Sequence, residues 1–151
     1  MPTREMTTVT VLPLRSWQDP QGNAVLVFTD ADCAVFLPCW DNAGEPADHI
    51  CRLSFAHAAA VRSYRREFTP YQVPSHTHHS YILEVHGSDL LQEHLDYRRR
   101  TYPHSPPRHL RHFVVIAHDI YHEIVAESVI EDAVPSSGFS SPLLAPFRGT
   151  A

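Results

Sequence analysis

Apolar side chains recur at every second position on both sides of a short central segment, residues 88–100, and no other feature limits the fold as strongly. Leu83 and Val85 precede this segment with that spacing, and Phe113 and Val115 follow it. Successive side chains of a strand point to opposite faces of a sheet, so a period of two gives each strand an apolar face. The chain around 88–100 is therefore predicted to be β-sheet.

The same reasoning locates further strands. The candidates are residues 7–14, 24–29, 33–40, 50–55, 61–68 and 80–86, and a closing hairpin of 111–118 and 122–131. Residues 29–32 read as a hairpin turn, and residues 41–48, with Gly44 and Pro46, read as a loop. Alanine and arginine also suit a helix at 56–67, so that alternative stays open beside the favoured strand.

Residues 88–100 have the marks of a helix. Ser88 or Asp89 can cap its start, Leu91 and Leu95 lie one turn apart, and arginines 98–100 suit its negative end. The predicted fold class is α+β: a mainly antiparallel sheet, as a sandwich or a partly open barrel, with one main helix at about 88–100.

The length of 151 residues, with 43% hydrophobic residues, suits one globular domain. We expect that domain to cover 1–133 and the Pro/Ser/Gly-rich residues 134–151 to form a flexible tail. No apolar run approaches the roughly 20 residues of a membrane helix, and the N-terminus has no signal core. Three cysteines without a Cys-x-x-Cys pair suit buried free thiols in a reducing cytoplasm.

The charge is −5 with histidines neutral, so the chain as a whole has no electrostatic footprint for nucleic acid. All twelve basic residues are arginines, which together with thirteen prolines suggests a GC-rich, bacterial coding sequence.

The chain is rich in histidine, and one group of these residues has metal-ligand spacing. His76 and His78 are two residues apart, and Glu84 and His86 share their even parity. If this segment is extended, all four side chains point to one side and suit a divalent ion such as zinc. The segment locally resembles the first metal-binding motif of cupin barrels, although the spacing to Glu84 is longer and no second motif is present. A small metal-dependent enzyme or metal-binding protein is the alternative function.

No complete catalytic signature stands beside this cluster. There is no Gly-x-Ser-x-Gly elbow and no glycine-rich phosphate loop, and the three cysteines occupy apolar strand patterns in which the pKa of a thiol rises. The absence of a catalytic signature, the net negative charge and a predicted acidic face all favour a non-enzymatic, protein-binding accessory protein without a cofactor. The residues of that face are Glu123, Glu127 and Glu131. Exposed strand edges also make a homodimer possible.

The C-terminal half resembles an uncharacterised family of small bacterial proteins. The similarity covers residues 50–131 and rests on two motifs: a strand running into a Ser-Asp helix cap at 84–89, and a closing hairpin with His118-Asp119 at its turn and 123–128 in its return strand. The resemblance implies structural motifs and no activity. Some such small proteins act as immunity or accessory proteins beside toxins, so an immunity-type role is one version of the expected function.

Overall fold

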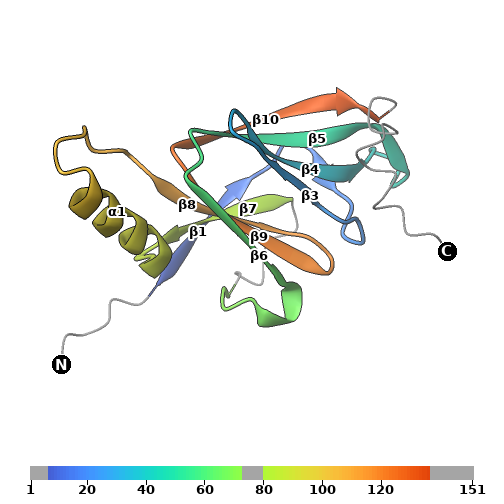
Figure 1. Cartoon of the computed structure of the whole chain (residues 1–151). Coiled ribbons are helices and arrows are strands. Elements are labelled where there is room, and N and C mark those ends of the chain that lie inside the picture. Colours follow the sequence, from blue (N-terminus) through green and yellow to red (C-terminus); the bar gives the residue numbers. More distant parts are fainter. Residues whose placement is uncertain (1–6, 73–79, 137–151) are drawn as a thin grey trace.

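Two antiparallel sheets packed face to face make up most of the computed structural model, which describes residues 7–72 and 80–136 (Figure 1). Sheet A has the strand order β1-β7-β8-β9-β6, and sheet B has the order β10-β5-β4-β2, with β3 also paired to β4. The strands are β1 (Thr8–Pro13), β2 (Trp17–Gln18), β3 (Val25–Phe28), β4 (Cys33–Trp40), β5 (Pro46–Ala56), β6 (Ala60–Arg65), β7 (Tyr81–His86), β8 (Arg111–Ile116), β9 (Ile120–Ala126) and β10 (Ser128–Pro135). A 3₁₀ turn, η1 (Arg66–Phe68), follows β6, and the helix α1 (Asp89–Thr101) follows β7.

The main core lies between the two sheets. Along β4 every second side chain is buried, from Cys33 to Cys39, and the opposing residues of β8 and β9 fill the other side of the layer. Phe55 of sheet B and Phe113 of sheet A meet there, with ring centroids 5.6 Å apart. Both faces of sheet A are apolar in places, since Leu83 and Val114 belong to a second buried cluster on its outer face.

A bent two-stranded ladder joins the two sheets. β5 pairs with β10 in sheet B, and their continuations β6 and β9 pair in sheet A. The chain turns between the sheets at His57, which has a φ of 50°, and at Glu127, whose N–H donates to the carbonyl of Ala56. Side chains on one face of this ladder point into the core before and after the bend.

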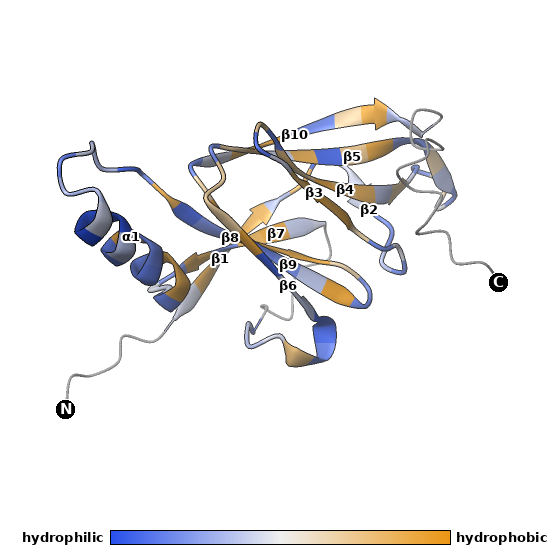
Figure 2. Ribbon diagram, in the orientation of Figure 1, coloured by the Kyte–Doolittle hydropathy of each residue, from blue (hydrophilic) through white to orange (hydrophobic). Residues whose placement is uncertain are grey.

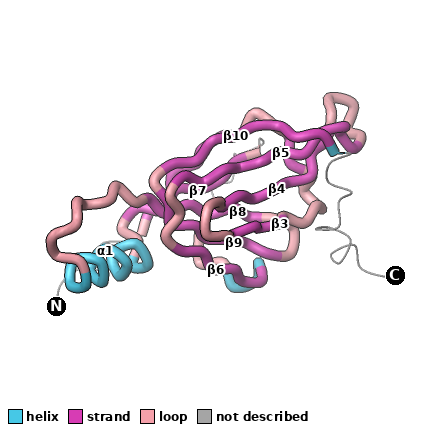
Figure 3. Tube along the Cα trace, turned by 45° about the horizontal axis from the view of Figure 1, so that its top comes forward, coloured by secondary structure: helices cyan, strands magenta, loops and turns pink. Residues whose placement is uncertain are grey.

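The helix α1 lies at one end of the sandwich (Figures 1 and 3), beside β1 and β8 (Figure 1). Its N-cap is Ser88, whose Oγ accepts a hydrogen bond from the N–H of Leu91 at 3.0 Å. Gly87 has a φ of 67°, which lets the chain turn sharply from β7 into the helix. None of the helical residues is buried, and most of the helix is hydrophilic (Figure 2). The Leu91 and Leu95 side of α1 is therefore only half covered.

The predicted fold class is confirmed: the protein is α+β, mainly antiparallel sheet, with sheet B curved as a half-barrel. Residues 60–65 form a strand rather than a helix, and the hairpin at 29–32 is present. The predicted loop 41–48 is shorter, because Gly44 closes a tight turn at a φ of 77° and β5 already begins at Pro46.

Two expectations at the C-terminus need correction. The return strand 122–131 is in fact two strands, β9 and β10, which belong to different sheets. β10 also continues to Pro135, so residues 134 and 135 belong to a sheet and not to a tail. Residues 137–151 lie outside the described part of the chain. Across the described ranges, no helix has the length and apolar character needed to cross a bilayer.

Phe113 supplies a test of this packing. Its side chain is fully buried between the sheets, so Phe113→Ala removes buried apolar surface and leaves a cavity in the core. We expect this substitution to lower the free energy of unfolding by about 3–5 kcal/mol. Chemical denaturation measures the change, with Phe68→Ala as the control, since Phe68 is 66% exposed and should change stability little. Equal effects of the two substitutions would contradict the sandwich.

Candidate functional site

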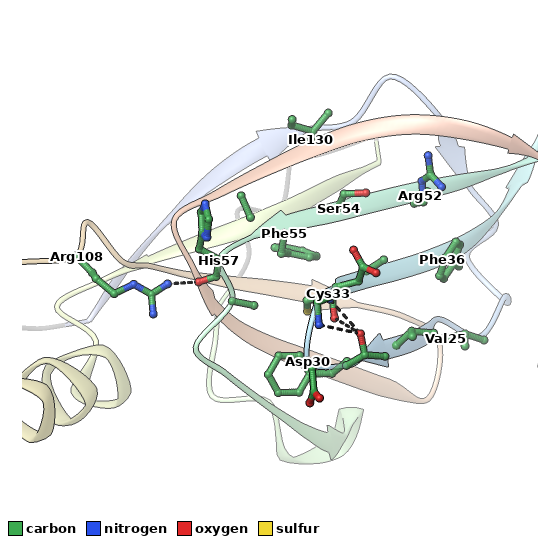
Figure 4. A pocket seen from close by; sticks show the side chains of 18 residues that line it. Val25, Asp30, Cys33, Phe36, Arg52, Ser54, Phe55, His57, Arg108 and Ile130 are labelled. Atoms are coloured by element: carbon green, nitrogen blue, oxygen red, sulfur yellow. Dashed lines mark hydrogen bonds between the residues drawn. The ribbon is translucent and has the colours of Figure 1, made fainter.

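A groove of about 970 Å³ lies on sheet B (Figure 4). Its floor includes outward-facing side chains of β3, β4 and β5, such as Val27, Phe36 and Ser54. The turn between β3 and β4 closes one end, and His57 and Arg108 close another, joined by a hydrogen bond from the Arg108 guanidinium to the carbonyl of His57. Ile130 on the edge strand β10 forms a rim.

The groove combines exposed apolar side chains with charge at its borders. Phe28 is 47% exposed and Ile130 is 66% exposed. Asp30 and Asp32 lie at the turn end, both exposed. Large apolar side chains left in water beside a concavity mark a surface that is suited to binding a partner.

The arginines of the groove are already engaged. Arg52 makes a two-bond ion pair with Asp132, at 2.9 and 2.5 Å, and this holds the pKa of the Asp132 carboxyl below its usual range. Arg108 donates to Glu127 at 3.3 Å as well as to His57. The exposed carboxylates of Asp30 and Asp32 are therefore the main charged groups with which a ligand in the groove can interact.

A second cluster of polar side chains lies on the outer face of sheet A. The Glu123 side chain is only 1% exposed, yet its carboxylate accepts hydrogen bonds from His112 Nε2 at 3.0 Å, from the hydroxyl of Tyr71 and from Arg62 Nε. His112 Nδ1 lies 2.6 Å from Ser88 Oγ. These residues come from β9, β8, the 69–72 loop, β6 and the helix N-cap, so only the tertiary fold brings them together.

The charge of Glu123 follows from these bonds. Burial by itself would raise the pKa of this carboxyl, but the hydrogen bonds from His112, Arg62 and Tyr71 outweigh it and lower the pKa to about 2. The group is therefore an anion at neutral pH. Burial and the hydrogen bond to Glu123 raise the pKa of Tyr71, so the phenol keeps its proton and donates it.

The predicted metal ligands are not brought together in the described chain. His76 and His78 lie outside the described residues. Glu84 and His86 do share one side of β7, but both oxygens of Glu84 accept hydrogen bonds from Arg111, at 2.8 and 2.6 Å. His86 Nε2 lies 2.7 Å from the hydroxyl of Thr10. Within the described residues no group of three or more His, Cys, Asp or Glu side chains is arranged to hold a metal ion.

The three glutamates of the predicted binding face are also separated. Glu123 is buried on sheet A, and Glu127 stands at the bend with Arg108. Glu131 is on sheet B, its side chain 12% exposed, and it accepts hydrogen bonds from the N–H groups of Arg15 and Ser16. They do not form one acidic surface, because the chain changes sheets between them.

The cysteines are buried free thiols, as expected, but their acidities differ. A hydrogen bond with Cys51 lowers the pKa of Cys39 to about 7, against the effect of burial. The same contact, together with burial, raises the pKa of Cys51. Burial raises the pKa of Cys33 to about 11. The expectation that every thiol pKa rises is therefore wrong for Cys39, because β4 and β5 place a second thiol beside it.

Two functional features were not identified from the sequence. The groove depends on which apolar residues remain uncovered, and no local pattern states that. The buried cluster has a partial signal, since His112 and Glu123 interrupt two strongly apolar strands at positions that face the same way.

Comparisons with protein-family models, with curated proteins and with solved structures give no match to this chain. The resemblances to the family of small bacterial proteins and to the cupin motif therefore remain predictions.

Replacing the buried carboxylate tests its role in stability. Glu123→Gln leaves Arg62 and His112 without their anion, and breaking a buried ion pair typically costs about 3–5 kcal/mol at neutral pH. In the wild type, the pKa of Glu123 is lower in the folded than in the unfolded chain. Its stabilisation is thus present above about pH 5 and lost as the pH falls towards 2.

Urea denaturation between pH 7 and pH 3 measures this effect. The stability difference between wild type and Glu123→Gln should narrow as the pH falls. Asp132→Asn is the control, because the Asp132 carboxyl is 43% exposed and its pair with Arg52 contributes little. A difference that stays constant over this range would show that Glu123 is not a buried anion.

Proposed function

We propose that this protein acts by binding a partner protein, and that the groove on sheet B receives an apolar segment of that partner carrying a basic residue. The observation that carries this proposal is the pair of exposed apolar side chains that line this groove, Phe28 at the end of β3 and Ile130 on β10, the two edge strands that border it. An immunity-type protein, which blocks a toxin by binding it, is one form of this function.

The shape of the groove suits a chain segment better than a small molecule. It extends from the β3–β4 turn to Arg108 across three strands, and it is bordered by β3 and β10, the edge strands of sheet B. Apolar side chains that enter such a surface lose contact with water, which contributes roughly 25 cal/mol per Å² of buried apolar area.

The charges favour a basic partner. Asp30 and Asp32 stand exposed at one end, while Arg52 and Arg108 are neutralised by their own carboxylate partners. The net charge of −5 acts in the same direction at longer range, by accelerating the approach of a cationic partner.

We place this activity in the cytoplasm. Cys33, Cys39 and Cys51 are buried free thiols, which suits a reducing compartment.

A selection from a displayed peptide library tests the proposal. We expect the selected peptides to share apolar residues and at least one Lys or Arg. Phe28→Ala combined with Ile130→Asp should weaken binding at least about tenfold, because two apolar anchors of an interface are lost. Calorimetric titration of one selected peptide measures the change.

Phe68→Ala is the matched control. Phe68, at 66% exposure against 47% for Phe28, is an exposed phenylalanine on η1 that does not line the groove, so its loss should leave the affinity unchanged. Asp30→Asn with Asp32→Asn should weaken binding mainly at low salt. Peptides without a shared pattern, or binding that is unaffected by the Phe28 and Ile130 substitutions, would refute the groove as the binding surface.

A further inference from the structure

The buried cluster on sheet A contains a serine, a histidine and a carboxylate in one hydrogen-bonded line, and it lies away from the sheet B groove. Ser88 Oγ is 2.6 Å from His112 Nδ1, and His112 Nε2 is 3.0 Å from Glu123 Oε1. Ser88 is 9% exposed, and His112 and Glu123 are each 1% exposed. This geometry meets the two distance requirements of an activated nucleophile, a serine–base contact and a base–carboxylate contact.

The direction of the proton chain follows from the charge of Glu123. A carboxylate only accepts hydrogen bonds, so His112 Nε2 must carry a proton and donate it. In the neutral imidazole Nδ1 is then an acceptor, and the Ser88 hydroxyl donates to it. Ser88 Oγ at the same time accepts from the N–H of Leu91, which agrees with this direction. The ring nitrogens have exchanged roles relative to serine proteases, but either nitrogen can act as a base.

The surroundings hold the base in place. Tyr71 packs edge-on against the His112 ring, at 6.2 Å between centroids and 86° between planes, and its hydroxyl also donates to Glu123. Arg62 fixes the other carboxylate oxygen. The imidazole is therefore fixed both by its hydrogen bonds and by packing, which a base in a preorganised site requires.

A pocket of about 700 Å³ opens onto this line. Its lining includes apolar side chains from β1, β7 and α1, together with Ser88, His112, Tyr71 and Arg62. The apolar lining residues among these are Val9, Val85 and Leu90. The positive end of the α1 dipole lies at Ser88, where it stabilises negative charge that develops near the serine. The charged side chains facing the pocket are Arg62 and Asp89.

We propose that Ser88 is a nucleophile that reacts with carboxylic esters bearing a short apolar acyl group. Ser88 Oγ forms a bond to the acyl carbon while its proton passes to His112 Nδ1, and the ester C–O bond breaks as that proton is delivered to the leaving alkoxide. Water then attacks the acyl carbon of the acyl-serine and gives a proton to His112 Nδ1. The bond from the acyl carbon to Ser88 Oγ breaks as His112 returns that proton to Oγ, which releases a carboxylic acid and restores the serine. Glu123 orients and stabilises the protonated imidazole; Tyr71 and Arg62 are positioning residues.

The chain contains an internal control. Ser63 Oγ is also 2.6 Å from a histidine Nδ1, that of His122. His122 Nε2, however, has no hydrogen-bond partner of ordinary geometry among the described residues, and no carboxylate stands behind it. Burial lowers the pKa of His122 and so disfavours the imidazolium that a base must become. Ser63 therefore has the serine–histidine contact without the rest of the site.

A fluorophosphonate probe tests the proposal on the full chain. The probe forms a phosphorus–oxygen bond with an activated serine and loses fluoride, and peptide mass spectrometry locates the adduct. We expect one adduct, on Ser88, in wild type and in Ser63→Ala. Ser88→Asn should give none while keeping its melting temperature, because asparagine also caps a helix. His112→Gln should slow labelling by at least about a hundredfold, as expected for loss of a general base.

Hydrolysis of p-nitrophenyl butyrate provides the second readout. We expect an initial burst of nitrophenol equal to the concentration of the protein, because each molecule has one Ser88. Folded wild type without an adduct on Ser88, or labelling of Ser88 and Ser63 at equal rates, would overturn the proposal and leave Ser88 as a helix cap only. If the absence of a cooperative unfolding transition shows that His112→Gln is not folded, comparison of the wild type with Ser63→Ala and Ser88→Asn still tests whether Ser88 is the nucleophile. If the probe labels Ser88 completely and the affinity of a selected peptide for the sheet B groove stays the same, the two surfaces act independently.

Discussion

One carboxylate withdrawn from water, that of Glu123, holds together parts of this protein that are far apart in the sequence. An ion buried at 1% exposure is tolerated only when its hydrogen-bonding capacity is filled, since the cost of desolvating it is several kcal/mol. Arg62, Tyr71 and His112 fill that capacity from three different segments, and His112 extends the chain of bonds to Ser88. The positions of β6, of the loop after η1, of β8 and of the start of α1 are thereby coupled to β9.

The sandwich separates the surfaces on which chemistry and recognition can take place. Its inner faces are filled by apolar side chains, several of them fully buried, such as Val35, Leu53 and Phe113. A ligand is therefore confined to the surface of the sandwich and cannot enter between the sheets. Sheet A presents a polar cluster beside a pocket, and sheet B presents an apolar groove with acidic residues at one end. The bent ladder of β5–β6 and β9–β10 fixes these two surfaces relative to one another.

Much of the fold could be predicted, because its elements depend on local patterns. The helix from Asp89 to Thr101, its cap Ser88 and the hairpins follow from residues within a few positions of one another. The pattern failed at Glu127, where an unbroken period of two was expected although the chain passes from one sheet to the other. In the structure the core-facing positions shift by one residue at the bend, from Ile124 and Ala126 before it to Val129 after it. The acidic face of Glu123, Glu127 and Glu131 was inferred from this unbroken period.

The candidate sites were less accessible to the same reasoning. Glu84 and His86 do lie on one side of a strand, but Arg111, 27 residues after Glu84, engages the carboxylate. Cys39 differs from the other two cysteines because Cys51 of the next strand stands beside it. In each case a partner distant in the sequence decides the chemistry of the side chain.

The sequence by itself determined the helix and most of the strands, because these depend on side-chain period and capping within a turn or two. It left residues 56–67 open between strand and helix, and it did not mark the change of sheet at Glu127. Only the tertiary structure decided that Glu123 is buried beside His112 and that Phe28 and Ile130 are left in water. Pairing register and the packing of two sheets bring together residues separated by tens of positions, and the environment of a charge or an apolar side chain is a property of those neighbours rather than of the residue itself.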